Sequence, residues 1–265
     1  MKRLITAIGL ILLALYLVFL APQPVFLIAA LFFGVICYWE YSGLVARHSI
    51  PRPGAFGFLT GVLILFWPLH RLPAIYFLGG LSILAVLAFT TSLRYPDMRE
   101  VLPQVACALL GGFYAFAPWR FAIDLRRESV HLLFFSLALN WAGDSAAYYI
   151  GRQFGRHKLA PLVSPKKSWE GAAASVAGSI LFGVLYLGRF MPSLRWWQVI
   201  GMAVLGNVAG QFGDLAESAM KRGAGVKDSG TIVPGHGGML DRLDSSLFAL
   251  PVIYVLYAAI AANRG

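Results

Sequence analysis

Long apolar runs separated by short polar segments are the dominant pattern of this sequence. Nine such runs cover residues 4–21, 25–45, 55–69, 74–92, 101–119, 130–150, 172–190, 196–212 and 246–262. An α-helix needs about 20 residues to cross roughly 30 Å of hydrocarbon, and most of the runs approach that length. The pattern therefore predicts an all-α, polytopic integral membrane bundle of about nine transmembrane helices.

Composition supports a membrane protein and excludes a soluble globular enzyme. Of the 265 residues, 58% are apolar and only 13% are charged, and the mean hydropathy is +0.70. Ordinary soluble domains are about 45–50% apolar and about 25% charged. A protein core cannot bury this much apolar surface, whereas a bilayer can.

The basic residues predict the orientation of the helices. The chain carries 22 Lys and Arg against 12 Asp and Glu, a formal charge of +10. If the N-terminus is cytoplasmic, most basic residues fall in cytoplasmic segments, as the positive-inside rule requires. We therefore expect a cytoplasmic N-terminus and polar loops that face the cytoplasm. The positive charge then reflects anionic membrane lipid and anionic substrates, and no nucleic-acid partner is expected.

Acidic residues gather in two polar segments, 143–171 and 213–245. These segments hold Asp144, Glu170, Asp214, Glu217, Asp228, Asp241 and Asp244. Acids contribute little to membrane orientation, so topology does not explain this clustering. Carboxylates at a membrane edge are costly, and a functional role is the default hypothesis for them.

The segment 213–245 begins with an acid, a hydroxyl and a base on one predicted helix face. Asp214, Ser218 and Lys221 have the required spacing if the helix that starts at residue 196 continues to Arg222. Gly223 and Gly225 then indicate the end of the helix. The structural alternative is a capped helix end with a surface ion pair.

A glycine-rich turn follows, with three glycines around His236. Glycines allow backbone N–H groups to approach and bind an anion. Asp241 and Asp244 come next and share one face of the following helix. Mg²⁺ prefers oxygen ligands, so Asp214 and Asp241 on separate helices are candidate ligands.

The segment 143–171 contains the sequence SPKKSWEG, in which Lys166 and Lys167 form a positive pair. Pro165 favours a turn, while Ser168 and Glu170 are typical of a helix start. The alternative role for the two lysines is attraction to anionic lipid at the membrane surface.

The sequence SAMKRGAGVKDSGTIVPGHGGMLDRLD, residues 218–244, resembles the signature of phosphatidate cytidylyltransferases, the CDP-diacylglycerol synthases. The family pattern S-x-x-K-R, K-D, P-G-H-G-G and D-R-x-D is present in full. SPKKSWEG is similar to the family block S-P-K-K-T-x-E-G, with Ser168 in place of Thr. The residues around Asp144 resemble an N-D-x-x-A-Y segment, with Gly143 where Asn is common.

This resemblance implies transfer of CMP from CTP to phosphatidate, which gives CDP-diacylglycerol and pyrophosphate. It implies Mg²⁺ bound by Asp214 and Asp241, and it leaves room for a second, monovalent cation. The implied catalytic residues are Asp214, Lys221, Arg222, Asp228, His236, Asp241 and Asp244. The implied substrate-binding residues are Asp144, Lys166, Lys167, Ser218, Lys227, Gly237, Gly238 and Arg242. The chain would then divide into N-terminal transmembrane helices, 1–95, and a C-terminal catalytic region, 96–265, and a homodimer is left open.

Two other functions are compatible with parts of the pattern. A CTP-dependent polyprenol kinase or a related lipid cytidylyltransferase would share polar loops and metal-binding acids. A secondary transporter of an anionic solute would instead place charges at the membrane midplane in paired halves. The full signature favours phosphatidate, and the acids cluster at one membrane edge late in the chain.

Overall fold

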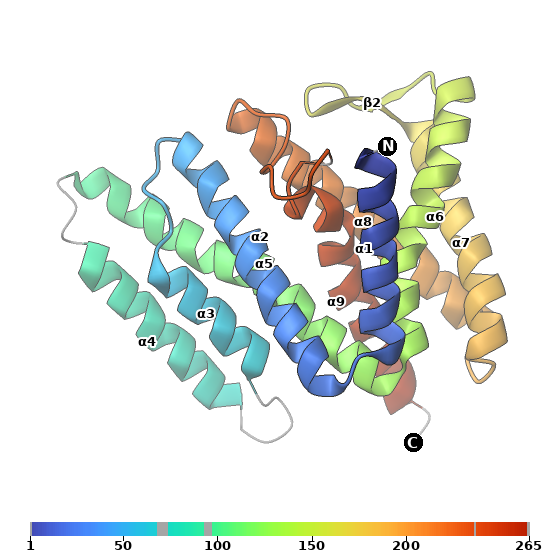
Figure 1. The fold of residues 1–265 in the computed structure, drawn as a ribbon, viewed down its shortest axis with the longest axis horizontal. Coiled ribbons are helices and arrows are strands. Elements are labelled where there is room, and N and C mark those ends of the chain that lie inside the picture. The colour runs from blue at the N-terminus through green and yellow to red at the C-terminus, as the bar shows by residue number, and fades with distance from the viewer. Residues whose placement is uncertain (1, 68–73, 93–96, 236, 264–265) are drawn as a thin grey trace.

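The computed structural model describes residues 2–67, 74–92, 97–235 and 237–263. In this part of the chain, α-helices form a bundle and one short hairpin lies at its end (Figure 1). The elements are α1 (Lys2–Leu15), the π-helical turn η1 (Tyr16–Leu20), α2 (Gln23–Arg47), α3 (Ala55–Phe66), α4 (Ala74–Ser92), the 3-10 turn η2 (Met98–Glu100), α5 (Val101–Glu128), α6 (Val130–Phe154), β1 (Lys158–Ala160), β2 (Ser164–Ser168), α7 (Trp169–Phe190), α8 (Trp196–Gly223) and α9 (Leu240–Ala262).

Six of the described helices are long and apolar enough to cross a membrane. They are α2, α4, α5 together with η2, α7, α8 and α9. Two shorter apolar helices cover Thr6–Leu20 and Ala55–Phe66. The predicted all-α membrane bundle is therefore confirmed at this level, while the count of nine spans stays a prediction.

Local sequence signals set the ends of the helices around the polar segments. The Ser168 side chain caps α7 and accepts a hydrogen bond from the backbone N–H of Gly171 at 3.1 Å. The predicted continuation of the helix through Arg222 is confirmed, because α8 ends at Gly223. Gly225 follows with φ of +69°, a left-handed conformation that glycine adopts without the penalty other residues incur.

The segment that precedes α7 is a β-hairpin, which is a departure from the expected all-helical chain. Strands β1 and β2 are antiparallel, with Lys158 opposite Ser168 and Ala160 opposite Ser164. Pro165 was expected in a turn, but it lies inside β2. The hairpin therefore places the SPKKS sequence on an extended strand.

Helix α5 runs through the bundle and contacts α2, α3, α6 and α9. Large apolar side chains of these helices form the core, and Phe116, Phe135 and Leu250 are fully buried. The hairpin, the loop after α8 and the start of α1 lie at one end of the bundle, while α9 finishes at the opposite end (Figure 1). The fold therefore brings both polar segments to the same end.

Candidate active site

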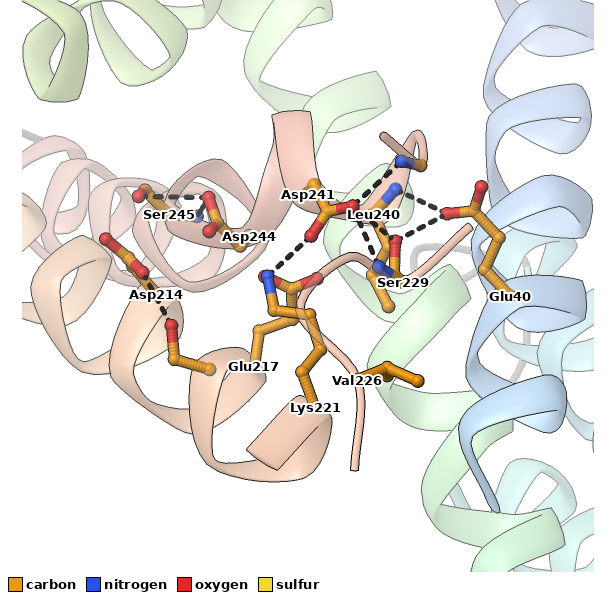
Figure 2. Close-up of polar contacts among 12 residues, drawn as sticks. Glu40, Asp214, Glu217, Lys221, Val226, Ser229, Leu240, Asp241, Asp244 and Ser245 are labelled. Carbon is orange, nitrogen blue, oxygen red and sulfur yellow. Dashed lines mark hydrogen bonds and ion pairs between the residues drawn. The ribbon is translucent and has the colours of Figure 1, made fainter. Parts of the chain in front are cut away.

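The last turns of α8 carry a row of interacting polar side chains (Figure 2). Ser218 donates a hydrogen bond to Asp214, with 3.2 Å between Oγ and Oδ1. One turn later, Lys221 Nζ lies 2.8 Å from Glu217 Oε2 and 2.5 Å from Asp241 Oδ1. Glu217 has no exposed surface and Lys221 is also buried. The predicted helix face is therefore present, and Glu217 belongs to it.

Asp241, in the first turn of α9, holds the loop between α8 and α9. Its Oδ2 accepts hydrogen bonds from the backbone N–H of Ser229 at 2.9 Å and of Gly238 at 2.8 Å. Gly235 and Gly237 have φ of +78° and +84°, left-handed values that suit glycine. These glycines turn the chain back so that the Gly238 N–H points at Asp241 and is no longer free to bind an anion.

The hairpin supplies a second lysine–carboxylate pair. Lys167 Nζ on β2 lies 2.5 Å from Asp214 Oδ2 on α8, and both side chains are partly buried. Arg222 strengthens the same junction, because its guanidinium donates to the Val163 carbonyl at 3.4 Å and to the Val226 carbonyl at 3.1 Å. The two polar segments predicted from the sequence thus lie in contact with each other.

A cleft of about 460 Å³, here called the basic cleft, opens between the hairpin and α6, α7 and α8. Three basic side chains, Arg152, Lys166 and Lys167, contribute to its wall together with Asp144 and Gln211. This concentration of positive charge suits an anion with several negative charges.

A second cavity of about 480 Å³, here called the apolar groove, lies between α1, α2, α6 and α9. Its long walls are apolar and include Leu10, Ala14, Phe33 and Leu137. One end is polar and is lined by Asp144, Asp241, Arg242 and Asp244. Asp144 therefore lines both cavities, which places a charged chamber beside an apolar one.

Comparison with known proteins identifies the family. A family model described as the cytidylyltransferase family matches residues 1–260. The chain belongs to this family. Among its relatives, the phosphatidate cytidylyltransferase of Staphylococcus aureus (strain COL) is 34% identical over 203 residues, which cover 74% of this chain and 76% of the relative. The phosphatidate cytidylyltransferases of Staphylococcus haemolyticus and Bacillus subtilis (strain 168) are each 30% identical, over 96% and 97% of this chain respectively and 97% of each relative.

The cytidylyltransferase residues predicted from the sequence fall into three groups in the structure. Hydrogen bonds or ion pairs join Lys167, Asp214, Ser218, Lys221, Gly238 and Asp241. The cavities are lined by Asp144, Lys166, Lys167, Asp241, Arg242 and Asp244. Outside these two groups, Arg222 contacts backbone carbonyls, Lys227 and Asp228 have exposed side chains on the loop, and Gly237 forms part of the turn. His236 lies outside the described residues.

The carboxylates of the site are of the chemical type that binds Mg²⁺. Asp214 and Asp241 offer carboxylate oxygens, which this ion prefers, and each carboxylate already lies 2.5 Å from a lysine ammonium group. Within the described parts of the chain, no three His, Cys, Asp or Glu side chains form a metal site of protein ligands alone. Mg²⁺ usually takes one or two carboxylates, and substrate phosphates and water complete its shell.

Sequence reasoning missed two groups of polar residues in this family member. Glu40 on α2 contacts the loop before α9, and its only sequence signal is an acid inside an apolar run. The other group is a chain of amides, of which Asn140 and Asn207 are buried: Gln211 Nε2 lies 2.7 Å from Asn207 Oδ1, and Asn207 Nδ2 lies 3.3 Å from Asn140 Oδ1. Asn207 and Gln211 are one helical turn apart, a spacing that would have shown their shared face.

Proposed function

We propose that this chain transfers CMP from CTP to phosphatidate and so produces CDP-diacylglycerol and pyrophosphate. The observation that carries the proposal is the position of Asp144, which lines both the basic cleft and the apolar groove. A charged nucleotide and a membrane lipid need these two environments next to each other. The names of relatives that are 30% and 34% identical support this choice of substrates.

The proposed reaction depends on alignment and charge neutralisation. An oxygen of the lipid phosphate forms a bond to the α-phosphorus of CTP, while the bond to the β-phosphate oxygen breaks and pyrophosphate leaves in line. The attacking oxygen is already anionic, so the step does not require a strong general base. Arg152, Lys166 and Lys167 would bind the triphosphate in the basic cleft, and Arg242 would bind the lipid phosphate at the polar end of the groove.

We also propose that the activity depends on Mg²⁺, with Asp214 and Asp241 as the ligands. A bound Mg²⁺ ion supplies positive charge to the phosphate oxygens. The chain itself contributes alignment, because Lys167 is paired with Asp214 and Lys221 with Asp241. A second, monovalent cation is part of the same proposal, and titration of the activity with K⁺ at fixed Mg²⁺ tests it.

For the membrane arrangement, we propose nine spans, with the N-terminus and the site on the cytoplasmic side of the bacterial inner membrane. Helix α6, of 25 residues, and the two shorter apolar helices would supply the three spans beyond the six long ones. The start of α1 lies at the same end of the bundle as both polar segments, and α9 finishes at the other end (Figure 1). CTP is soluble in the cytoplasm, so a site at that membrane face meets both substrates.

The test is an assay of purified protein in detergent micelles with phosphatidate, Mg²⁺ and CTP labelled in its cytidine. We expect the label to enter the lipid fraction, EDTA to stop the transfer, and unlabelled dATP not to compete. Asp214→Asn should abolish transfer while the protein still inserts and purifies normally. Asp97→Asn is the matched control, because Asp97 caps η2 and lines neither cavity.

Other results would change the assignment. Transfer of the γ-phosphate to a polyprenol, without cytidine transfer, would assign the chain to CTP-dependent lipid kinases. Absence of turnover with every lipid acceptor, together with uptake of an anionic solute into proteoliposomes, would assign it to transporters. Full activity of Asp214→Asn would remove the proposed metal ligand.

A further inference from the structure

Glu40 is an acid on α2, a helix on which the sequence pattern places no chemistry. We propose that Glu40 is a positioning residue, which fixes the start of α9 and thereby holds Asp241 in the geometry that cytidylyl transfer needs. The kinetic part of this inference rests on the proposed function, whereas its structural part can be measured without turnover.

Both carboxylate oxygens of Glu40 bind the start of α9, and Figure 2 shows the contacts of one of them with Leu240 and Ser229. Oε1 accepts a hydrogen bond from the Met239 N–H at 3.0 Å, and Oε2 accepts one from the Leu240 N–H at 2.8 Å. The first N–H groups of a helix have no partner inside the helix, and Met239 provides no side-chain cap. Glu40 therefore caps α9 from another helix, and its negative charge suits the positive end of the helix dipole.

Ser229 connects Glu40 directly to Asp241. The Ser229 hydroxyl oxygen lies 3.0 Å from Glu40 Oε2 and 3.0 Å from Asp241 Oδ2. The backbone N–H of Ser229 also binds Asp241, and Asp241 in turn contacts Lys221. A change in the position of the Glu40 carboxylate would therefore be passed to a proposed metal ligand through one residue.

The burial of Glu40 argues for a role beyond packing. The residue is only 3% exposed, and in the described parts of the chain the ion pairs all join other residues. A buried charge without an ionic partner is costly, even when hydrogen bonds compensate part of that cost. The Glu40 carboxylate offers one acceptor oxygen to each of the Met239 and Leu240 N–H groups, whereas a neutral amide has a single acceptor oxygen.

Two glycines leave the space that the Glu40 carboxylate occupies. A Cβ atom at Gly238 would lie 2.5 Å from Glu40 Oε2 and 2.1 Å from Ser229 Oγ. A Cβ atom at Gly230 would lie 2.5 Å from Glu40 Oε1. Both distances to Glu40 are shorter than a carbon–oxygen contact allows. The last glycine of the P-G-H-G-G sequence thus accommodates a side chain from a distant helix.

A second contact joins α2 to the helices that carry the site residues. His48, which follows α2, lies with Nε2 3.3 Å from the Met220 carbonyl on α8. The end of α2 therefore contacts α8 and the start of α9, the two helices that carry Asp214 and Asp241.

The experiment compares Glu40→Gln and Glu40→Ala with Tyr38→Phe. Tyr38 lies on the same helix, is buried, and donates to the backbone carbonyls of Pro53 and Gly54 away from the site, so it is the matched control. Loss of a residue that orients a metal ligand typically lowers activity about 10- to 100-fold. We expect that loss in kcat for Glu40→Ala, a smaller loss for Glu40→Gln, and unchanged KM for both substrates. Tyr38→Phe should lower the Tm but keep kcat.

Hydrogen exchange provides the readout that does not depend on activity. In Glu40→Ala, we expect faster exchange of the Met239 and Leu240 amides, measured by mass spectrometry of peptides that cover the start of α9. Tyr38→Phe should leave these amides unchanged. If Glu40→Ala does not fold, Glu40→Gln carries the comparison, because its side-chain oxygen retains one of the acceptors.

Each remaining outcome has a defined meaning. Wild-type kcat in Glu40→Ala, or wild-type exchange at Met239 and Leu240, would overturn the positioning role. A loss of Tm without a loss of kcat per folded molecule would show a structural role only and would equally overturn it. If the wild-type protein transfers no cytidine, the proposed function fails, while the exchange data still decide what Glu40 holds.

Discussion

Lys166 and Lys167 are neighbours in the sequence, but the structure gives them different surroundings. Lys167 is partly buried and its ammonium lies 2.5 Å from Asp214, whereas Lys166 is exposed on the wall of the basic cleft. Both residues line the basic cleft, and the ion pair with Asp214 is what distinguishes Lys167 from its neighbour. Lys167 can therefore orient an acid of the site, while Lys166 is free to bind a substrate phosphate.

We predict distinct kinetic effects for the two lysines. Lys166→Ala should raise the KM for CTP about 10-fold or more with little change in kcat, because a hydrogen bond to a charged group contributes about 1.5–3 kcal/mol. Lys167→Ala should lower kcat as well, because Asp214 loses its partner. Steady-state kinetics in micelles measure both effects, and Lys158→Ala, an exposed lysine on β1, is the control. Identical effects of the two substitutions would contradict the different roles.

At this scale the sequence predicts much of the site, because its residues are close together along the chain. The spacing of Asp214, Ser218 and Lys221 requires only a continuous helix, and α8 provides it. Glu40 could not be assigned in this way. Its partners are 199 and 200 residues away, and an isolated acid in an apolar run does not reveal which backbone it meets.

Among the helices, the junction of α6, α7 and α8 depends on a residue without a side chain. Gly143 on α6 is buried, and a Cβ atom there would lie 2.5 Å from Ser175 Oγ, 2.6 Å from Asn207 Nδ2 and 2.8 Å from Ser179 Oγ. Gly143 is the position at which the resemblance to the family motif led us to expect Asn. In this chain, Ser175, Ser179 and Asn207 fill the space that a side chain at Gly143 would need.

We predict that Gly143→Ala destabilises the protein. Overpacking of a well-filled interior typically costs about 1–3 kcal/mol, so the Tm in detergent should fall. Gly201→Ala on α8 is the matched control, because a Cβ atom there would meet no neighbour within 4 Å. That variant should keep or raise the Tm, since alanine favours a helix over glycine by about 0.5–1 kcal/mol. A Gly143→Ala variant as stable as Gly201→Ala would show that the junction can adjust.

The elements differ in how well their sequences predicted them. Ser168 and Gly225 marked a helix start and a helix end because capping chemistry is local. The hairpin was missed because Pro165 and the lysine pair resemble a turn, and pairing with β1 depends on residues outside the motif. Apolar runs located the helices, but they carry no information about which helices touch.

For the whole molecule, the polar end of the bundle gives a direct test of orientation. Leu162, between β1 and β2, is 93% exposed. Pro192 is also exposed and lies in the loop between α7 and α8, at the other end of α7 from the hairpin. If the site faces the cytoplasm, these two positions lie on different sides of the membrane.

We predict opposite labelling of single cysteines at these positions. Cys37→Ala and Cys107→Ala first remove the free native cysteines. A membrane-impermeant maleimide should then label Leu162→Cys in inverted vesicles and Pro192→Cys in intact spheroplasts. Cytidylyl transfer should persist in both variants and so report a native fold. The reverse labelling pattern would overturn the proposed orientation.

Long-range contacts at this scale were not visible in the sequence, because a motif reports its own spacing and nothing about distant partners. Glu40 lies in the predicted N-terminal part of the chain, yet it binds the loop and helix of the predicted C-terminal region. The N-terminal helices therefore support the site as well as span the membrane.

The contact between Glu40 and the start of α9 also has a consequence for how the protein is made. A chain grows at about 5–20 residues per second. Because Leu240 follows Glu40 by 200 residues, the donor on Leu240 is synthesised roughly 10–40 s after the Glu40 carboxylate. During that interval the nascent bundle contains an acid whose hydrogen-bond donors have not been synthesised. The start of α9 then supplies the hydrogen-bond donors for this carboxylate. A chain that stops before α9 would keep the carboxylate without these donors and be an easier target for membrane proteases.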